Sequence, residues 1–281
     1  MDFGAAMFFT DYSMGAAELA RALEARGFES VWAPEHSHIP LSRRSPYQAG
    51  GELPKQYYEV MDPFVSLAAA AAVTKTIRLG TGVCLITQRD TIQTAKLVAS
   101  LDQVSGGRFL FGIGGGWNAE EMEDHGTVFK TRFKLMRERV EAMKEIWTKD
   151  AAEYHGELVE FGPMAAWPKP VQKPHPPVIV GGAFPHAARR ALRYGDGWIP
   201  NASRQQYADV TDYLPQFKEM AAEAGRTIRV TIWGAGEDYD RLRRYEEQGV
   251  ARLVVSLPPE DAAATLPALD RWAELIRRVG R

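Results

Sequence analysis

Two histidines with one residue between them, His36 and His38, follow an apolar stretch at residues 28–34. Both could point to one face of an extended segment and bind a metal, as in barrel hydrolases. A metal site needs more ligands, and the ends of the later apolar stretches carry glycine, asparagine and serine instead. We therefore expect no metal, regard His38 as a surface or loop residue, and keep a metal hydrolase as the less favoured alternative.

Covalent hydrolysis is also disfavoured by the residue pattern. The sequence has no Gly-x-Ser-x-Gly elbow, and its one cysteine, Cys84, has no base nearby in the sequence. One cysteine also excludes an internal disulfide, which is typical of a reducing cytoplasm.

Three successive glycines, Gly114, Gly115 and Gly116, end an apolar run that has the character of a buried strand. Without side chains there, a flat or large ligand can approach the backbone, although a plain glycine-rich turn explains the pattern equally well. The stretch is not a dinucleotide fingerprint, because Trp117 stands where glycine or a small residue is required, and no Lys-Ser/Thr pair follows as in a P-loop. Trp117 itself could stack on a ring or cover the opening of a barrel.

A second glycine pair, Gly181 and Gly182, precedes Ala183 and a predicted helix at residues 185–194. Backbone N–H groups left free at a helix N-terminus favour a phosphate, and a tight strand-to-helix turn is the alternative explanation. The predicted strand ends are glycine-rich and hold few ionisable groups. This composition suits an enzyme whose chemistry belongs to a bound organic cofactor.

Strands and helices alternate along the chain, which indicates about eight strand–helix units. We expect strands at residues 3–10, 28–34, 77–86, 108–111, 178–180, 197–200, 228–235 and 251–257. Helices are expected between them at residues 62–74, 90–105, 129–148, 185–194, 205–224, 239–248 and 266–279, after a first one that Gly27 ends. Eight units predict a closed (β/α)8 barrel, and a doubly wound open sheet is the rival.

Two segments interrupt the alternation. Residues 39–61 form a long loop with three prolines, and a loop of that length is often a lid. Residues 151–177 are rich in proline, can turn a hairpin, and are too short for a core of their own. We expect this segment to be an insertion lying over the barrel, within a single domain spanning residues 1–281.

Charge and composition exclude several classes of partner. The 281 residues carry a formal net charge of −2, so nothing indicates binding to nucleic acid or to a membrane surface. The first residues, MDFGAAMFF, lack the basic start of a signal peptide, and no apolar run is long enough to span a bilayer. We expect a cytoplasmic protein that acts on a small molecule.

Several motifs together resemble the bacterial-luciferase-like superfamily, in particular its actinobacterial branch of deazaflavin (coenzyme F-420) dependent oxidoreductases. These motifs are APEHSHIP, RLGTGVCLI, SGGRFLFGIGGGWNAEEMEDHG, PPVIVGG and GDGWIP, and they run in order over nearly the whole chain. The resemblance implies a luciferase-like (β/α)8 TIM barrel with the late insertion, and a homodimer, since many relatives are dimers.

The resemblance also implies where the cofactor lies. The ring would rest against a bulge in the third strand, with a non-proline cis peptide within Val83-Cys84-Leu85, and the phosphate would meet Gly181, Gly182 and Ala183. Glu35 stands where relatives carry an acid that hydrogen-bonds the cofactor. The cofactor-binding residues implied in this way are Glu35, Val83, Cys84, Leu85, Gly114, Gly115, Gly116, Trp117, Asn118, Gly181, Gly182 and Ala183.

His36 matches the histidine that sugar-phosphate and alcohol dehydrogenases of this group use as general base, which takes the substrate's hydroxyl proton as hydride leaves. Two features depart from their pattern. Ile39 and Pro40 lie where several of those enzymes carry a tryptophan, and Trp117 replaces a glutamate proposed to protonate the ring. A reductase or dehydrogenase for a bulkier apolar substrate fits better than a sugar-phosphate dehydrogenase.

Three functions follow from the resemblance. The leading one is an oxidoreductase that transfers hydride between coenzyme F-420 and an organic substrate. The second is an FMN-dependent monooxygenase supplied by a partner flavin reductase. The third is a flavin-binding barrel without catalytic activity, to which the missing glutamate lends weight.

Overall fold

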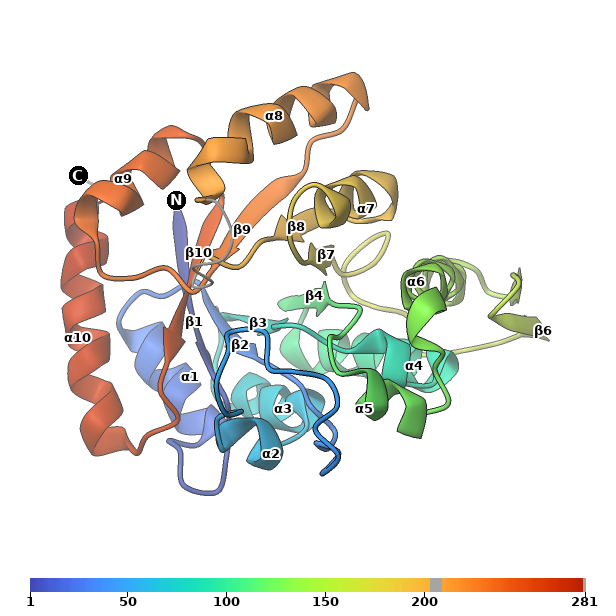
Figure 1. Cartoon of the computed structure of the whole chain (residues 1–281), viewed down its shortest axis with the longest axis horizontal. Helices are drawn as coiled ribbons and strands as arrows, with labels where there is room; N and C mark the ends of the chain where they lie inside the picture. The colour runs from blue at the N-terminus through green and yellow to red at the C-terminus, as the bar shows by residue number, and fades with distance from the viewer. Residues whose placement is uncertain (203–208, 280–281) are drawn as a thin grey trace.

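Eight parallel strands close into a barrel in the computed structural model, which describes residues 1–202 and 209–279 (Figure 1). Around the barrel the order is β1-β10-β9-β8-β7-β4-β3-β2. The strands are β1 (Asp2–Met7), β2 (Ser30–Ala33), β3 (Arg78–Thr81), β4 (Phe109–Ile113), β7 (Val178–Gly181), β8 (Gly197–Ile199), β9 (Arg229–Trp233) and β10 (Arg252–Leu257). The predicted (β/α)8 barrel is confirmed, and the open-sheet alternative is wrong.

Helices cover the outside of the strands (Figure 1). They are α1 (Ala16–Ala25), α3 (Pro63–Val73), α4 (Thr91–Ser105), α6 (Arg132–Thr148), α7 (His186–Tyr194), α8 (Val210–Glu223), α9 (Tyr239–Glu247) and α10 (Ala262–Val279). Asp62 and Asp90 begin α3 and α4 by accepting hydrogen bonds from the backbone N–H groups of the first turn. The first residues of the helix predicted at 205–224 lie outside the described residues. No helix in the described part of the chain is long and apolar enough to cross a membrane.

Side chains fill the interior of the barrel, so that it is a packed core and not a pore. The fully buried ring of Trp32 occupies the space beside Gly80, where an added Cβ would lie 2.3 Å from the ring atom Cε3. Its indole Nε1 donates a hydrogen bond of 2.8 Å to Ser30 Oγ. The rest of this inner cluster shares an apolar character and comprises Ala6, Leu110, Ile179, Ile199 and Val254. Trp198, predicted to lie in the core, is fully buried.

The third strand is shorter than the sequence predicts. It ends at Thr81, and Cys84 pairs with Ile113 only through an isolated bridge. The non-proline cis peptide joins Gly82 to Val83, so its predicted position within Val83-Cys84-Leu85 is wrong by one bond. Apolar residues continue to Ile86, although the strand ends at Thr81. The apolar pattern alone therefore does not show where the backbone leaves the sheet.

Short helices also lie in segments predicted as loops. α2 (Gln56–Glu59) belongs to the long loop at residues 39–61, and α5 (Ala119–Asp124) follows the glycine-rich end of β4. Two 3₁₀ turns, η1 (Ile86–Gln88) and η2 (Phe129–Thr131), lead into α4 and α6. Helices this short carry too little periodicity to be found from sequence.

The insertion at residues 151–177 contains an antiparallel pair, β5 (Ala152–His155) and β6 (Glu160–Met164), as the hairpin pattern predicts. Val159 packs with Leu135 and Ala142 of α6, so the hairpin lies beyond the helix ring and not over the strand ends (Figure 1). None of residues 151–177, all of which the structure describes, lines the cavity described below.

Candidate active site

A cavity of about 740 Å³ opens at the ends where the barrel strands finish. Functional groups of (β/α)8 enzymes gather at this end of the barrel, because the loops that follow the strands meet there. The predicted site residues that line it are Glu35, His36, Val83, Leu85, Gly114, Gly115, Gly116, Trp117, Gly181, Gly182 and Ala183. Cys84 and Asn118 are buried behind this lining.

His36 is fixed in place by a buried carboxylate. Its Nδ1 lies 2.9 Å from Oε2 of Glu121, and the two side chains are 7% and 1% exposed. The other carboxylate oxygen of Glu121 accepts the backbone N–H of Ser37 at 3.2 Å. An ionised carboxylate only accepts hydrogen bonds, so Nδ1 carries a proton and Nε2 of the neutral ring is left as the basic nitrogen. The geometry is that of a proton acceptor with a preset tautomer.

Glu121 has no role in the sequence-based interpretation, although it belongs to the GWNAEE stretch that carries the resemblance. It lies 85 positions from His36 in the chain and reaches it from the first turn of α5. Glu121 is completely buried, which is unusual for a carboxylate and marks it as functional. Burial is known only from the fold, so the sequence alone carries no signal for this residue.

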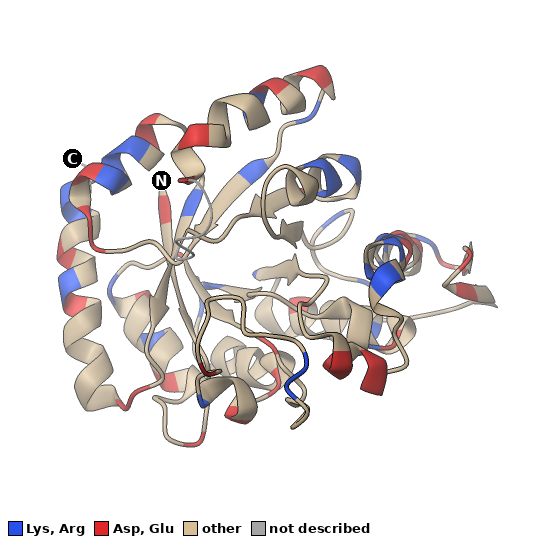
Figure 2. Cartoon of the chain, in the orientation of Figure 1, with Lys and Arg blue, Asp and Glu red and all other residues tan. Residues whose placement is uncertain are grey.

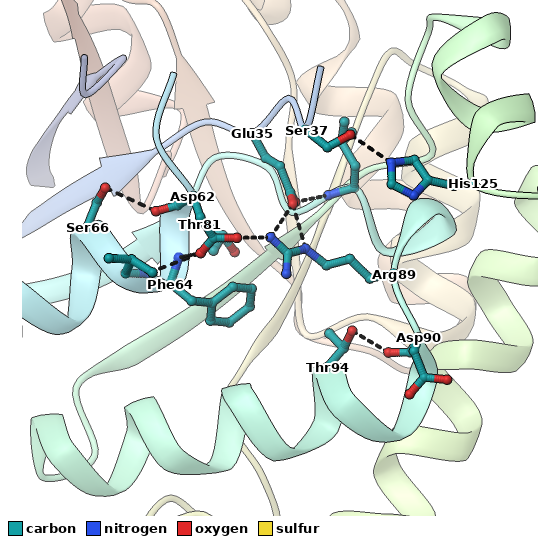
Figure 3. Close-up of polar contacts among 12 residues, drawn as sticks. Glu35, Ser37, Asp62, Phe64, Ser66, Thr81, Arg89, Asp90, Thr94 and His125 are labelled. Atoms are coloured by element: carbon teal, nitrogen blue, oxygen red, sulfur yellow. Dashed lines mark hydrogen bonds and ion pairs between the residues drawn. The ribbon is translucent and has the colours of Figure 1, made fainter. Parts of the chain in front are cut away.

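Glu35 is engaged inside the protein. Its Oε2 accepts the backbone N–H of Leu85 at 2.6 Å, and Oε1 accepts Nε of Arg89 at 2.5 Å. Arg89 also pairs with Asp62 at the start of α3 (Figure 3). Burial is the largest single influence on the pKa of Arg89 and lowers it, but the acidic neighbours, Glu35 foremost and Asp62 with it, together raise that pKa. The network holds the segment after the cis peptide against β2, and burial raises the pKa of the Cys84 thiol in that segment, which is therefore unreactive.

The glycines after β4 make room for other side chains of the protein. An added Cβ on Gly114 would lie 2.4 Å from Cγ2 of Val83, and one on Gly115 would lie 2.6 Å from Cε1 of Phe133. Both Val83 and Phe133 line the cavity. Val83 and Phe133 therefore occupy part of the space that the glycines were predicted to leave open for a ligand. A ligand in the cavity would lie against these two side chains.

Two arginines without acidic partners flank the ring of Phe133. The guanidinium carbons of Arg132 and Arg190 lie 4.3 and 3.9 Å from the ring centroid. Among residues 1–202 and 209–279, neither has a carboxylate within 4.0 Å, and the buried Nε of each has no hydrogen-bond partner. Burial lowers the pKa of both, and for Arg132 the nearby charge of Arg190 adds to the effect. Two partly buried positive charges that repel each other are an arrangement that an anion would stabilise.

The turn after β7 lies beside this arginine pair. Gly182 has φ +127°, and a Cβ there would be 3.8 Å from Nη2 of Arg190. The N–H of Gly182 donates to the carbonyl oxygen of Ile199 at 3.2 Å, so the prediction that this N–H is free is wrong. In the described part of the chain, the N–H groups of Ala183 and Phe184 make no backbone hydrogen bond, and they remain for an anion near the start of α7.

Charge is distributed unevenly around the strand ends. Figure 2 shows basic residues gathered on α7 and acidic residues on α5. Asp124 of α5 lies 2.9 Å from Nε2 of His38, whose side chain is 40% exposed, as predicted for a surface residue. Ser37 Oγ contacts Nδ1 of His38 at 2.9 Å and Nε2 of His125 at 2.7 Å. No group of three or more His, Cys, Asp or Glu residues within the described ranges could hold a metal ion.

Aromatic rings surround His36. Its ring centroid lies 5.3 Å from that of Tyr57 and 5.8 Å from that of Trp117. Tyr47 contacts both of these, at 5.4 and 6.2 Å, and Phe8 lies 4.8 Å from Tyr57. We refer to Phe8, Tyr47, Tyr57 and Trp117 as the aromatic wall. Two of its members, Tyr47 and Tyr57, come from the loop at residues 39–61.

The chain is thus a closed (β/α)8 barrel with a histidine–carboxylate pair and a half-buried arginine pair at the ends of its strands. Residues 12–237 match the family model described as luciferase-like monooxygenase, and the chain belongs to this family. Proteins similar to this chain include F420-dependent and FMN-dependent members, so the family is one of flavin- or deazaflavin-dependent oxidoreductases and monooxygenases.

Individual relatives cover the chain to different extents. The uncharacterized protein Rv0953c of Mycobacterium tuberculosis is 39% identical over 97% of this chain and 98% of its own length. An F420-dependent glucose-6-phosphate dehydrogenase of Amycolatopsis mediterranei is 29% identical over 80% of this chain and 62% of its own length. Among solved structures, monooxygenase RslO1 from Streptomyces bottropensis has a TM-score of 0.81, with 20% identity and full coverage of both chains, and supports the fold alone.

Proposed function

We propose that this chain is an oxidoreductase that binds coenzyme F-420 in the cavity and transfers hydride to or from a small organic substrate. The single observation that carries the proposal is the half-buried pair Arg132 and Arg190, which lines the cavity without a carboxylate partner among the described residues and leaves both buried Nε atoms without a hydrogen bond. Within the described ranges, only Nη1 of Arg132 is engaged, donating to the carbonyl oxygen of Phe129 at 2.8 Å. Without a ligand these two like charges repel each other, whereas a phosphate placed there would form charge-assisted hydrogen bonds with both.

The lining fits the rest of such a cofactor. A planar ring would continue from the phosphate end across Val83 and Gly114, where the surface is apolar and free of charge. When bound, the deazaflavin ring supplies a two-electron hydride centre that reacts poorly with oxygen.

The protein's own groups would handle the proton. His36 would take the substrate's hydroxyl proton at Nε2, or return it in the reverse direction, while Glu121 holds Nδ1–H and stabilises the imidazolium. The aromatic wall would exclude water around the reacting atoms. Glu35 would act indirectly, by fixing the backbone at Leu85 beneath the ring.

The alternative cofactor is FMN, used with oxygen and a partner flavin reductase. It is supported by the FMN-dependent relatives of this chain, while the dehydrogenase from Amycolatopsis mediterranei supports F-420. The presence of an orienting carboxylate on His36 favours proton removal from an alcohol, and hence F-420. The single-domain assignment of residues 1–281, the homodimer and the cytoplasmic location remain predictions.

A fluorescence titration of the purified chain with F-420 and, separately, with FMN tests the cofactor. We expect tight binding of F-420 and weak binding of FMN. The reverse order would contradict the proposal in favour of an oxygen-using enzyme, and binding of neither would favour a barrel without catalytic activity.

Two variants test the assignment of the base. His36→Ala removes the proton acceptor, so turnover should fall by about 10²- to 10⁴-fold with F-420 affinity unchanged. Glu121→Gln keeps the shape of the side chain but not its charge, so turnover should fall less, with the pH–rate profile displaced. Substrates are sought by screening alcohols and carbonyl compounds against both redox states of the coenzyme. If His36→Ala turned over every accepted substrate at the wild-type rate, the assignment would be wrong.

A further inference from the structure

The cavity is divided into two sectors of different chemistry. The arginine pair and the turn at Gly182 lie over β4 and β7, while Phe8 and His36 follow β1 and β2. Around the barrel, β7 is three places from β2, with β3 and β4 between them. A cofactor anchored at Arg190 and resting on Gly114 and Val83 would occupy the first sector and reach His36 from one side. The sector bounded by the aromatic wall would then remain on the other side.

The aromatic wall is a continuous set of rings. His36, Tyr57, Tyr47 and Trp117 contact one another in a closed cycle, with centroid distances from 5.3 to 6.2 Å. Three of these four contacts are edge-to-face, with interplanar angles of 60° to 70°. All four rings line the cavity, and a lining of aromatic rings favours another aromatic ring over a flexible aliphatic chain.

Among the described residues, the carboxylates of the same sector are already paired within the protein. Glu35 is paired with Arg89, and Glu121 with His36 and the backbone of Ser37. Glu120 accepts the N–H of Ser45 at 2.8 Å and does not line the cavity. Arg43, whose guanidinium carbon lies 5.8 Å from the ring centroid of Trp117, does not line the cavity either.

We propose that the aromatic wall is the substrate subsite and that it selects an uncharged aromatic alcohol or the corresponding carbonyl compound. The ligand's ring lies against Tyr57 and Trp117, and its oxygen faces Nε2 of His36. The assignment of the oxygen rests on the proposed function, whereas the binding of an uncharged aromatic ring rests on the wall alone.

Equilibrium binding to the full chain tests the proposal without turnover. The probes are 1-(2-naphthyl)ethanol, its cyclohexyl counterpart 1-cyclohexylethanol, and the anion 2-naphthoate, measured by titration calorimetry with and without F-420. We expect the naphthyl alcohol to bind at least tenfold more tightly than either of the other two. We expect its affinity to be equal or higher when F-420 is bound, because the two ligands occupy different sectors.

Variants locate the subsite. Trp117→Leu and Tyr57→Leu should each weaken binding of the naphthyl alcohol by about tenfold, which corresponds to the loss of one aromatic contact and its buried area. The matched control is Trp167→Leu, because Trp167 lies in the insertion, is 58% exposed and does not line the cavity. Its affinity for the probe should be unchanged. The wild-type ranking of the three probes does not depend on the folding of any variant.

Several results would overturn the proposal. Competition between the naphthyl alcohol and F-420 would mean that the wall holds the cofactor ring. Tighter binding of 2-naphthoate than of the naphthyl alcohol, with F-420 bound at the arginine pair, would mean that the sector recruits an anion. Equal binding of the cyclohexyl probe would mean that the sector is merely apolar. Failure of the proposed function gives a different result, since F-420 would then fail to bind while the naphthyl alcohol still binds and still responds to Trp117→Leu.

Discussion

The two sides of the cavity differ in whether their charged side chains have partners of opposite charge within the protein. On the side of β2, Glu35 has Arg89 as a partner and His36 has Glu121. On the side of α6 and α7, Arg132 and Arg190 flank the ring of Phe133, and no acid in the described parts of the chain pairs with either. Where the protein supplies both members of an ion pair, the pair stabilises the local structure. Where it supplies only positive side chains, a ligand of opposite charge would complete the pair. Charged side chains would thus serve structure on one side of the cavity and recognition on the other.

The largest expected effect is on the paired side. Glu35→Gln leaves Arg89 without its buried partner and Leu85 with a poorer acceptor, so the free energy of unfolding should fall by about 3 kcal/mol. Urea denaturation of the cofactor-free chain measures this. The control is Glu59→Gln, which removes a carboxylate 3.1 Å from Lys55 at the surface and should change stability little. Equal effects of the two substitutions would contradict the structural role of the Glu35–Arg89 pair.

The next effect is on the unpaired side and has the opposite character. Arg190→Gln should leave the stability of the cofactor-free chain unchanged or slightly higher, because it relieves repulsion with Arg132. Affinity for F-420 should fall by about 10- to 100-fold through loss of charge-assisted hydrogen bonds. Arg189→Gln, on the exposed face of the same helix, is the matched control. A destabilised protein with intact F-420 affinity would reverse the roles that we assign to the two sides.

The smallest effect is a pH dependence on the paired side. Burial acts to raise the pKa of Glu120, but hydrogen bonds from the Ser45 hydroxyl and from the backbone N–H groups of Glu120, Ser45 and Arg44 together lower it to about 2, from an ordinary value of 4.5. A depressed carboxylate pKa stabilises the folded state above pH 4.5, and this contribution is lost as the pH falls from 4.5 toward 2. Unfolding curves of wild type and Glu120→Gln should therefore converge over that range. A constant difference between them would argue that Glu120 is not ionised in the folded protein.

The barrel could be predicted from sequence because its determinants are local. Each strand is a short apolar run, and each helix has a start or stop signal such as Asp62, Asp90 or Gly106, whose φ of +66° ends α4. A count of eight such units is enough to predict a closed barrel, and no contact between distant residues has to be known. The position of His36 at a strand end follows from the same local pattern.

The chemistry of the site could be predicted only in part, because its pairings join distant segments. Glu121 approaches His36 across 85 positions, and Arg89 approaches Glu35 across 54. The glycines after β4 indicate that another group packs closely against the backbone there, but only the fold shows that these groups are the side chains of Val83 and Phe133. Arg132 and Arg190 lie on helices rich in other basic residues, and no sequence pattern separates them from cations that merely face solvent.

Two neighbouring carboxylates of the six-residue helix α5 bind different parts of the protein. Glu121 holds His36, and Glu120 holds the loop at residues 39–61 through Ser42 and Ser45. For protein engineering, this makes the loop an exchangeable part with a defined attachment point. A redesigned loop that keeps both serines can carry new residues in place of Tyr47 and Tyr57 and so alter what the cavity accepts, while the proton-handling pair stays where it is.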